Sequence, residues 1–161
     1  MYNVVINLMN TRIVILAAGR SSRMKSDIPK LLLLVGGKPM VMRVLEAAIG
    51  SGVDARPVLV VGNNAEQLRQ VVGDRAEYVV QEHQLGTGHA VQSVEQSLKG
   101  KTEAILVLYG DNCMIGPEAI RRLAEGHAES GGVLTMLTTT IPDFEEWRKP
   151  FNDFGRIVRD A

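Results

Sequence analysis

Apolar runs of strand length alternate along this chain with stretches in which apolar and polar residues follow a helical period. The apolar runs are rich in Val, Ile and Leu and show little polar alternation, which is typical of strands buried on both faces. We expect strands at residues 12–16, 57–62, 77–81, 104–110 and 133–141. We expect helices at residues 39–50, 65–73, 87–100 and 117–129. This order predicts an α/β fold, a Rossmann-like, doubly wound and mostly parallel sheet with helices on both faces.

Proline and glycine mark the expected ends of these helices. Pro39 and Pro117 stand at first-turn positions, where the missing N–H group costs nothing. Gly50, Gly73 and Gly100 follow helical stretches, where glycine commonly ends a helix. We therefore expect these three glycines to act as C-caps.

The chain shows no repeat or linker, so residues 1–161 are expected to form a single domain, with residues 1–10 as a disordered lead. Residues 142–153, PDFEEWRKPFND, break the pattern and are expected to be a surface excursion. The last residues, GRIVRDA, enter what looks like another strand. A strand left there would be unpaired, so the chain is expected to be a C-terminally truncated part of a longer domain.

Composition narrows the possible partners and compartments. The formal charge is zero and only 4% of residues are aromatic, so the sequence predicts no nucleic-acid partner. No apolar run approaches the roughly 20 residues that span a bilayer, and the opening MYNVVINLMN lacks the features of a signal peptide. The single cysteine, Cys113, excludes an internal disulfide framework. A cytoplasmic protein without a membrane partner is expected.

The stretch LAAGRSSRMKSDIPK, residues 16–30, follows the first expected strand. Ala17, Ala18 and Gly19 have almost no side chain, so the backbone can approach a ligand and form an anion-binding nest. Arg23 and Lys30 would neutralise phosphate oxygens. A solvated basic loop is the alternative interpretation.

The segment QEHQLGTGHA follows the third expected strand. Gln81 offers an amide donor and an acceptor, the pair needed to read one edge of a pyrimidine base, and Gly86 and Gly88 admit a flat base. Thr87 is also expected to N-cap the following helix, and this structural role is compatible with a binding role.

Asp111 follows the fourth expected strand. A carboxylate there would suit Mg²⁺, which prefers one or two carboxylates together with substrate phosphates and waters. The alternative is that Asp111 is only a turn residue or cap. Because ligands bind at the carboxyl ends of strands in open α/β sheets, we expect these segments to meet at one rim.

Other candidates are weaker. The motif GxGxxG is absent from the turn after the first strand, and GGKP at residues 36–39 has proline where a P-loop needs Ser or Thr. His83, His89 and His127 show no metal-ligand spacing and are expected in surface or capping roles.

Together, these segments resemble the sugar-1-phosphate nucleotidyltransferases, which have a GT-A-like fold. The likeness is greatest to the uridylyltransferase domain of bifunctional N-acetylglucosamine-1-phosphate uridylyltransferases that are also glucosamine-1-phosphate acetyltransferases. LAAGRSSRMKSDIPK is similar to the family's signature loop, QLGTGHAV and LYGD to its base-binding and metal-binding motifs, and FGRIVRD to its downstream YGRIVR.

The resemblance implies a role for each matching residue. Arg23 and Lys30 would hold the triphosphate as the catalytic residues, Asp111 would bind Mg²⁺, and Gly155 would contact the sugar through its backbone. Uridine would be held by Leu16, Ala17, Ala18, Gly19, Gln81, Gly86 and Thr87. The implied substrates are UTP and a sugar 1-phosphate, and the implied products are UDP-N-acetylglucosamine, a cell-wall precursor, and pyrophosphate.

The sequence also departs from the family pattern. Asn112, Cys113 and Met114 follow YGD in place of a small residue and Pro-Leu, and residues 144–152 look inserted. The family's later sugar-contacting Glu and Asn, and its second metal-binding Asn, have no counterpart before Ala161. We therefore expect the chain to bind UTP and to turn over slowly.

Two other interpretations stay open. One is a transferase dependent on CTP or GTP, and the other is a non-catalytic nucleotide-binding module. Oligomeric state is open too, because the portion that trimerises in the family is absent, and an oligomer is an expectation only for a full-length parent.

Overall fold

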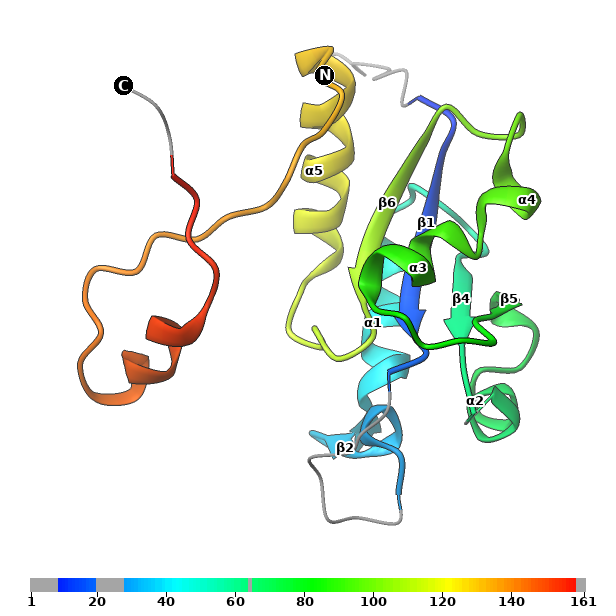
Figure 1. The fold of residues 1–161 in the computed structure, drawn as a ribbon, viewed down its shortest axis with the longest axis horizontal. Coiled ribbons are helices and arrows are strands. Elements are labelled where there is room, and N and C mark those ends of the chain that lie inside the picture. The colour runs from blue at the N-terminus through cyan, green and yellow to red at the C-terminus, as the bar shows by residue number, and fades with distance from the viewer. Residues whose placement is uncertain (1–8, 20–27, 64, 159–161) are drawn as a thin grey trace, which may run out of the picture.

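The computed structural model describes residues 9–19, 28–63 and 65–158. Within them a four-stranded sheet has the order β5-β4-β1-β6, and every pair in it is parallel (Figure 1). Its strands are β1 (Thr11–Ala17), β4 (Val58–Val61), β5 (Glu77–Val80) and β6 (Ala104–Tyr109). The parallel sheet predicted from the apolar runs is confirmed.

Helices cover both faces of this sheet. One face packs against α1 (Met40–Gly50), α2 (Ala65–Val72) and α5 (Pro117–Ser130). The other face packs against the shorter α3 (Thr87–Gln92) and α4 (Glu95–Leu98). Short 3-10 turns lie at Lys30–Leu32, Gly73–Arg75 and Glu146–Asp153. The doubly wound arrangement predicted from the alternation of strands and helices is therefore confirmed.

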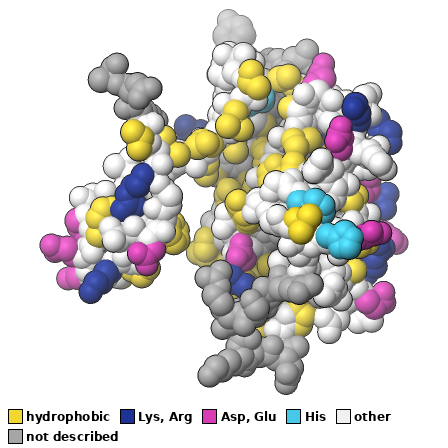
Figure 2. Space-filling model, in the orientation of Figure 1, with side chains coloured by type: hydrophobic (Ala, Val, Ile, Leu, Met, Phe, Trp, Pro, Cys, Tyr) yellow, Lys and Arg dark blue, Asp and Glu magenta, His cyan; other side chains and the backbone are white. Residues whose placement is uncertain are grey.

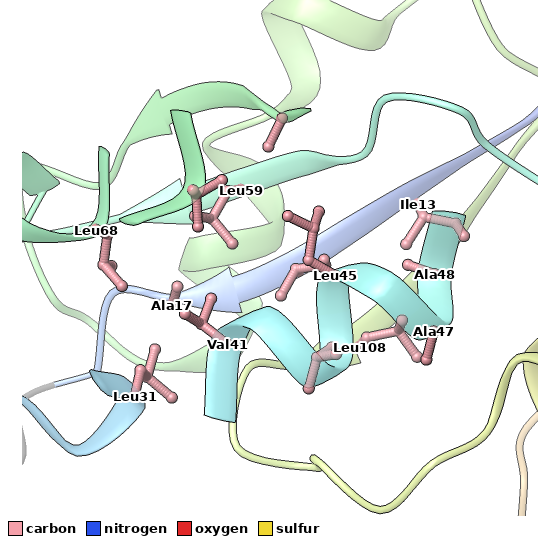
Figure 3. Close-up of a cluster of buried hydrophobic side chains, with 14 of the residues drawn as sticks. Ile13, Ala17, Leu31, Val41, Leu45, Ala47, Ala48, Leu59, Leu68 and Leu108 are labelled. Carbon is pink, nitrogen blue, oxygen red and sulfur yellow. The ribbon is translucent and has the colours of Figure 1, made fainter. Parts of the chain in front are cut away.

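Side-chain alternation along β1 explains the two layers. Ile13 and Ile15 are fully buried against the α1 side, whereas Val14, between them, is buried on the α3–α4 side. Figure 3 shows Val41 and Leu45 on α1 among the strand side chains of the first layer. Each fully buried aliphatic side chain contributes about 1.5–3 kcal/mol through removal from water, so this central strand anchors the fold.

A small hairpin precedes α1 and accounts for the GGKP sequence. It joins β2 (Leu34–Val35) to β3 (Lys38–Pro39) in antiparallel register. Gly36 and Gly37, between the strands, have φ of 57° and 75°. Two consecutive residues at positive φ are the requirement of a type I′ hairpin turn, which glycine meets without steric cost.

The strand expected at residues 133–141 is not formed. Val133 and Leu134 are 102% and 76% exposed, and no strand pairs with this segment in the described part of the chain. Since a strand is stabilised by its neighbour, an apolar β-rich run without a partner does not become one. Figure 2 shows hydrophobic side chains exposed between the body and the C-terminal segment.

Other boundaries differ from expectation in smaller ways. The single helix expected at residues 87–100 is divided by a turn at Ser93 and Val94 into α3 and α4. Gly73 and Gly100 follow their helices at positive φ as expected, but Gly50 is the last residue of α1 and Gly52 takes the left-handed conformation instead.

The C-terminal segment agrees with the surface excursion expected at residues 142–153. It leaves α5 and runs away from the body before its 3-10 turn (Figure 1). Trp147 is 69% exposed. Of the predicted disordered lead, residues 1–8 lie outside the described residues, while the backbone N–H of Asn10 donates to Glu103. No helix in the described ranges is long and apolar enough to cross a membrane.

Candidate active site

A cleft of about 990 Å³ opens at the carboxyl ends of the strands. The segments that follow β1, β5 and β6 all contribute to its wall, as expected for a parallel sheet. Residues from all three segments line it, among them Leu16, Lys30, Gln81, Gly86, Thr87 and Asp111. The three sequence motifs are therefore brought to one place.

An ion pair joins two of these segments across the cleft. Lys30 Nζ donates to Asp111 Oδ2 at 2.7 Å, although the two residues are 81 positions apart. The side chains are 41% and 38% exposed, so both charged groups remain accessible to a ligand entering the cleft. Exposed pairs of this kind contribute little to folding stability.

Gln81 lies just beyond β5, and its backbone N–H donates to Val61 O at 2.8 Å. Its side chain reaches back over the start of α3: Nε2 donates to Gly86 O at 3.3 Å and lies 2.9 Å from His89 Nδ1. Gly86 has φ of 107°, a conformation that favours glycine. It is Gly86 that occupies the N-cap position of α3, so the cap predicted for Thr87 is wrong and Thr87 is the first helical residue.

The end of β1 forms the floor between these groups. Leu16, Ala18 and Gly19 line the cleft. Ala17 is 1% exposed and packs in the core on the α1 side, because side chains alternate along a strand. Only the backbone of Ala17 is therefore close to the cleft.

Two glycines allow the neighbouring strands to approach this floor. A Cβ atom on Gly62 would lie 2.9 Å from Ala18 O, and one on Gly110 would lie 2.9 Å from Leu16 O. Both distances are shorter than carbon–oxygen contacts that folded chains tolerate without a shift. The glycine of the YGD motif is thus required by packing beside β1.

The two remaining predicted site residues, Arg23 and Gly155, are not among the described residues that line the cleft. Arg23 lies outside the described residues. Gly155 is exposed, is not part of the cleft lining and belongs to the C-terminal segment that runs away from the body (Figure 1).

The structure adds residues that the sequence did not single out. Gln84 Nε2 donates to Ala18 O at 2.8 Å and ties the loop after β5 to the end of β1. Tyr109, 49% exposed, lines the cleft beside Asp111. His89 contacts Gln81, as described above. Its position in the first turn of α3, close to Gly86 and Gly88, is the signal that the sequence offers, and that signal does not reveal a partner eight residues earlier.

The residues that line the cleft fit a metal ion that takes most of its ligands from a bound phosphate and from water. The described residues contain no group of three or more His, Cys, Asp or Glu side chains that could hold a metal. Asp111 offers one accessible carboxylate at the cleft. One carboxylate suits an ion that is bound together with ligand phosphates and water, which is the usual coordination of Mg²⁺ in proteins.

A parallel sheet with a polar cleft at the carboxyl ends of its strands is typical of nucleotide-binding α/β proteins. Comparison with known proteins identifies the family within that class. The profile of the MobA-like NTP transferase domain matches residues 13–145. The chain belongs to this family of nucleotidyltransferases, which confirms the resemblance seen in the sequence motifs.

Similar curated proteins are much longer than this chain. The bifunctional protein GlmU of Heliobacterium modesticaldum is 42% identical over 147 residues, which cover 91% of this chain and 30% of that protein. GlmU of Geobacter metallireducens is 42% identical over 148 residues, covering 91% and 29%. The chain thus spans less than a third of the length of the curated relatives that it matches.

Solved structures support the fold. Rv0371c of Mycobacterium tuberculosis superposes with a TM-score of 0.66 at 24% identity, covering 75% of this chain and 62% of that chain. A nucleotidyl transferase from Methanothermobacter gives 0.60 at 26% identity, covering 73% and 57%. CMP:2-keto-3-deoxy-manno-octonic acid synthetase complexed with CTP gives 0.58 at 27% identity, covering 76% and 48%.

Proposed function

We propose that this chain transfers a uridylyl group from UTP to a sugar 1-phosphate, with N-acetylglucosamine 1-phosphate as the acceptor. The observation that carries the proposal is that one cleft is lined both by the Lys30–Asp111 ion pair and by Gln81 and Gly86. A cleft of about 990 Å³ is large enough for a nucleotide together with part of an acceptor. The resemblance of LAAGRSSRMKSDIPK and QLGTGHAV to the motifs of the uridylyltransferase domain favours UTP and this sugar.

In the proposed reaction, a phosphate oxygen of the sugar 1-phosphate forms a bond to the α-phosphorus of UTP. The bond between the α-phosphorus and the bridging oxygen to the β-phosphate breaks, and its electron pair leaves with pyrophosphate. The other product is the UDP-sugar. Such a transfer needs positioning and charge neutralisation more than a covalent protein group, and no nucleophilic side chain is required.

The roles of the chain's residues follow from their places in the cleft. Lys30 would bind phosphate oxygens and balance charge on the departing pyrophosphate. Arg23, seven residues earlier in the same signature loop, would assist it. Gln81 and the backbone around Gly86 and Thr87 would hold the uracil ring. Leu16, Ala18 and Gly19 would pack under the nucleoside.

Asp111 would hold Mg²⁺ together with the phosphates. When bound, that ion supplies charge neutralisation at the phosphate oxygens. Lys30, which donates to Asp111 Oδ2 in this structure, would turn toward the phosphates when a nucleotide enters the cleft. Gly155 would reach the sugar only after the C-terminal segment moves toward the cleft.

Pyrophosphate release from UTP plus N-acetylglucosamine 1-phosphate tests the proposal, with UTP affinity measured by calorimetry as a second readout. Lys30→Met should weaken UTP binding about tenfold or more, because a charge-assisted contact to phosphate is lost. Lys99→Met is the matched control, since Lys99 pairs with Glu95 on α4 away from the cleft. Failure of all four nucleoside triphosphates to bind would refute the proposal.

A CTP-dependent transferase is the second candidate, favoured by the likeness to the CMP:2-keto-3-deoxy-manno-octonic acid synthetase. The same measurements with ATP, GTP, CTP and UTP decide between them. Tighter binding of CTP, with pyrophosphate released only from CTP, would replace the uridylyl assignment. Nucleotide binding without pyrophosphate release from any of the four would favour a non-catalytic nucleotide-binding module.

A further inference from the structure

The side-chain amide of Gln81 is held in one orientation by two contacts. Gln81 is 4% exposed, and its Nε2 atom faces both Gly86 O, at 3.3 Å, and His89 Nδ1, at 2.9 Å. A backbone carbonyl oxygen can only accept, so the NH₂ end of the amide must face Gly86. With Nε2 as the donor to both groups, His89 Nδ1 is an acceptor and the ring proton lies on His89 Nε2.

The contact with His89 is the stronger of the two. Its length of 2.9 Å is near the optimum for an N–H donor, whereas 3.3 Å to Gly86 O is long for a hydrogen bond. Loss of the histidine would leave the amide with only the weaker restraint. The orientation of Gln81 therefore depends mainly on His89.

This orientation leaves the carbonyl oxygen of the Gln81 amide available to a ligand. No hydrogen bond to Gln81 Oε1 is made within residues 9–19, 28–63 and 65–158. In the same ranges, the buried side-chain oxygen or nitrogen atom that lacks a partner belongs to Gln84 and not to Gln81. Gln81 lines the cleft, so its Oε1 atom is an accessible acceptor there.

We propose that His89 is a positioning residue that fixes Gln81 as an acceptor, and that the cleft therefore selects a pyrimidine whose ring N3 carries a proton. This inference rests on the proposed function, because it assumes that a nucleotide base reaches Gln81. Uracil offers N3–H as a donor to Gln81 Oε1. Cytosine offers an unprotonated N3, which would face that oxygen acceptor to acceptor.

Such a mismatch leaves a buried acceptor unpaired, and sites built to hydrogen-bond one group discriminate strongly against a ligand that lacks it. We expect UTP to bind about ten- to a hundredfold more tightly than CTP. If the amide were free to rotate, its NH₂ group could face cytosine N3, and most of that preference would disappear.

Three substitutions of His89 separate a positioning role from a merely structural one. His89→Asn places an oxygen acceptor close to the position of Nδ1, so it should retain most of the UTP preference. His89→Gln is similar in polarity, but its oxygen lies farther out, near the position of Nε2. His89→Leu removes the acceptor, and it should lower the preference to within about threefold, as should His89→Gln.

The readout is the ratio of UTP to CTP dissociation constants within each variant, measured by calorimetry. A ratio within one preparation does not depend on the folded fraction, so a modest loss of stability does not obscure it. His127→Leu is the matched control: His127, on α5, has its Nδ1 atom 2.9 Å from Thr135 Oγ1, and neither residue lines the cleft. It should leave the ratio unchanged.

The outcomes distinguish this inference from the proposed function. Binding of no nucleotide refutes the proposed function itself. Tight binding of UTP with a ratio that is the same in the wild type, His89→Asn, His89→Gln and His89→Leu keeps the proposed function and overturns the role of His89. A wild-type preference for CTP also overturns the role of His89, because a fixed acceptor at Gln81 would disfavour cytosine.

Discussion

The two ends of the main sheet carry ion pairs of different kinds. At the amino end, Asp54 accepts from Arg12 Nε at 2.8 Å, from the backbone N–H of Ile13 at 2.9 Å and from that of Arg56 at 3.0 Å. Its side chain is 8% exposed. At the carboxyl end, Asp111 is 38% exposed, and in the described residues its hydrogen-bond donor is Lys30 alone.

This difference separates a structural carboxylate from one suited to binding. Asp54 has its acceptor capacity filled by the fold, and Arg12 is held further by Glu77 at 3.0 Å. Burial, the largest single effect, lowers the pKa of the Arg12 guanidinium, but the hydrogen bonds and charges of Asp54 and Glu77 together raise it above its usual value. Asp111 keeps accessible lone pairs, which a metal ion or a ligand can use. The carboxylate at the amino end therefore stabilises the sheet, whereas the carboxylate at the carboxyl end is accessible to a ligand.

Asp54→Ala should cause the largest effect, a loss of about 3–5 kcal/mol in the free energy of unfolding. The substitution removes the acceptor for two backbone N–H groups and leaves Arg12 partly buried with less compensation. Urea unfolding followed by circular dichroism measures it. A loss smaller than about 1 kcal/mol would contradict the structural role.

Asp111→Asn should show the opposite pattern. We expect kcat/KM for pyrophosphate release to fall about a hundredfold or more, since the carboxylate proposed to hold the metal ion is lost. The free energy of unfolding should change by less than about 1 kcal/mol, because the pair with Lys30 is exposed.

Asp143→Asn is the control for that variant. Asp143 is also an exposed, ion-paired carboxylate, bound by Arg148 at 2.7 Å, but it lies in the C-terminal segment and does not line the cleft. It should leave turnover unchanged. Equal losses in the two variants would show that turnover is insensitive to the place of the carboxylate.

The glycines at the carboxyl end provide a third prediction. Gly62→Ala should destabilise the fold by about 1–3 kcal/mol, because the added Cβ would press on Ala18 O and on the Gln84 amide. Gly126→Ala is the matched control, since Gly126 lies inside α5 with nothing within 4 Å of its Cβ position. That variant should stabilise the protein by about 0.5–1 kcal/mol, the usual gain for Ala over Gly within a helix. If both variants changed the free energy of unfolding in the same direction, the close approach of Gly62 to Ala18 would be contradicted.

The sequence predicted the sheet well because β1, β4 and β6 are short apolar runs whose burial follows from their composition. Residues 133–141, VLTMLTTTI, are also rich in β-branched residues but do not become a strand, because pairing depends on a neighbour that the local pattern does not reveal.

Within the cleft, the pattern located Lys30, Gln81 and Asp111, since strand ends in a parallel sheet meet at one rim. It could not find the pair between Arg12 and Asp54, which depends on contacts 42 residues apart, or the contact between Gln81 and His89 across a turn. Nor did it show that Ala17 faces the core, although alternation along the strand carries that information.

The smallest predicted effect concerns an ion pair that belongs to neither end of the sheet. Lys38 in β3 donates to Glu46 in α1, and this hydrogen bond, opposed by burial, lowers the pKa of the Glu46 carboxyl. A carboxyl whose pKa is lower in the folded state stabilises the fold above its unfolded pKa. That contribution is lost as the pH falls through the folded value.

Lys38→Met should therefore cost less than about 1 kcal/mol at neutral pH, since both side chains are more than a third exposed and solvent screens the pair. The difference from wild type should vanish in acid, once Glu46 is protonated in both proteins. Urea unfolding at pH 7 and near pH 3 measures this. A difference that persists in acid would mean that the methylene chain of Lys38 stabilises the hairpin by packing, and the charge would then have no measurable role.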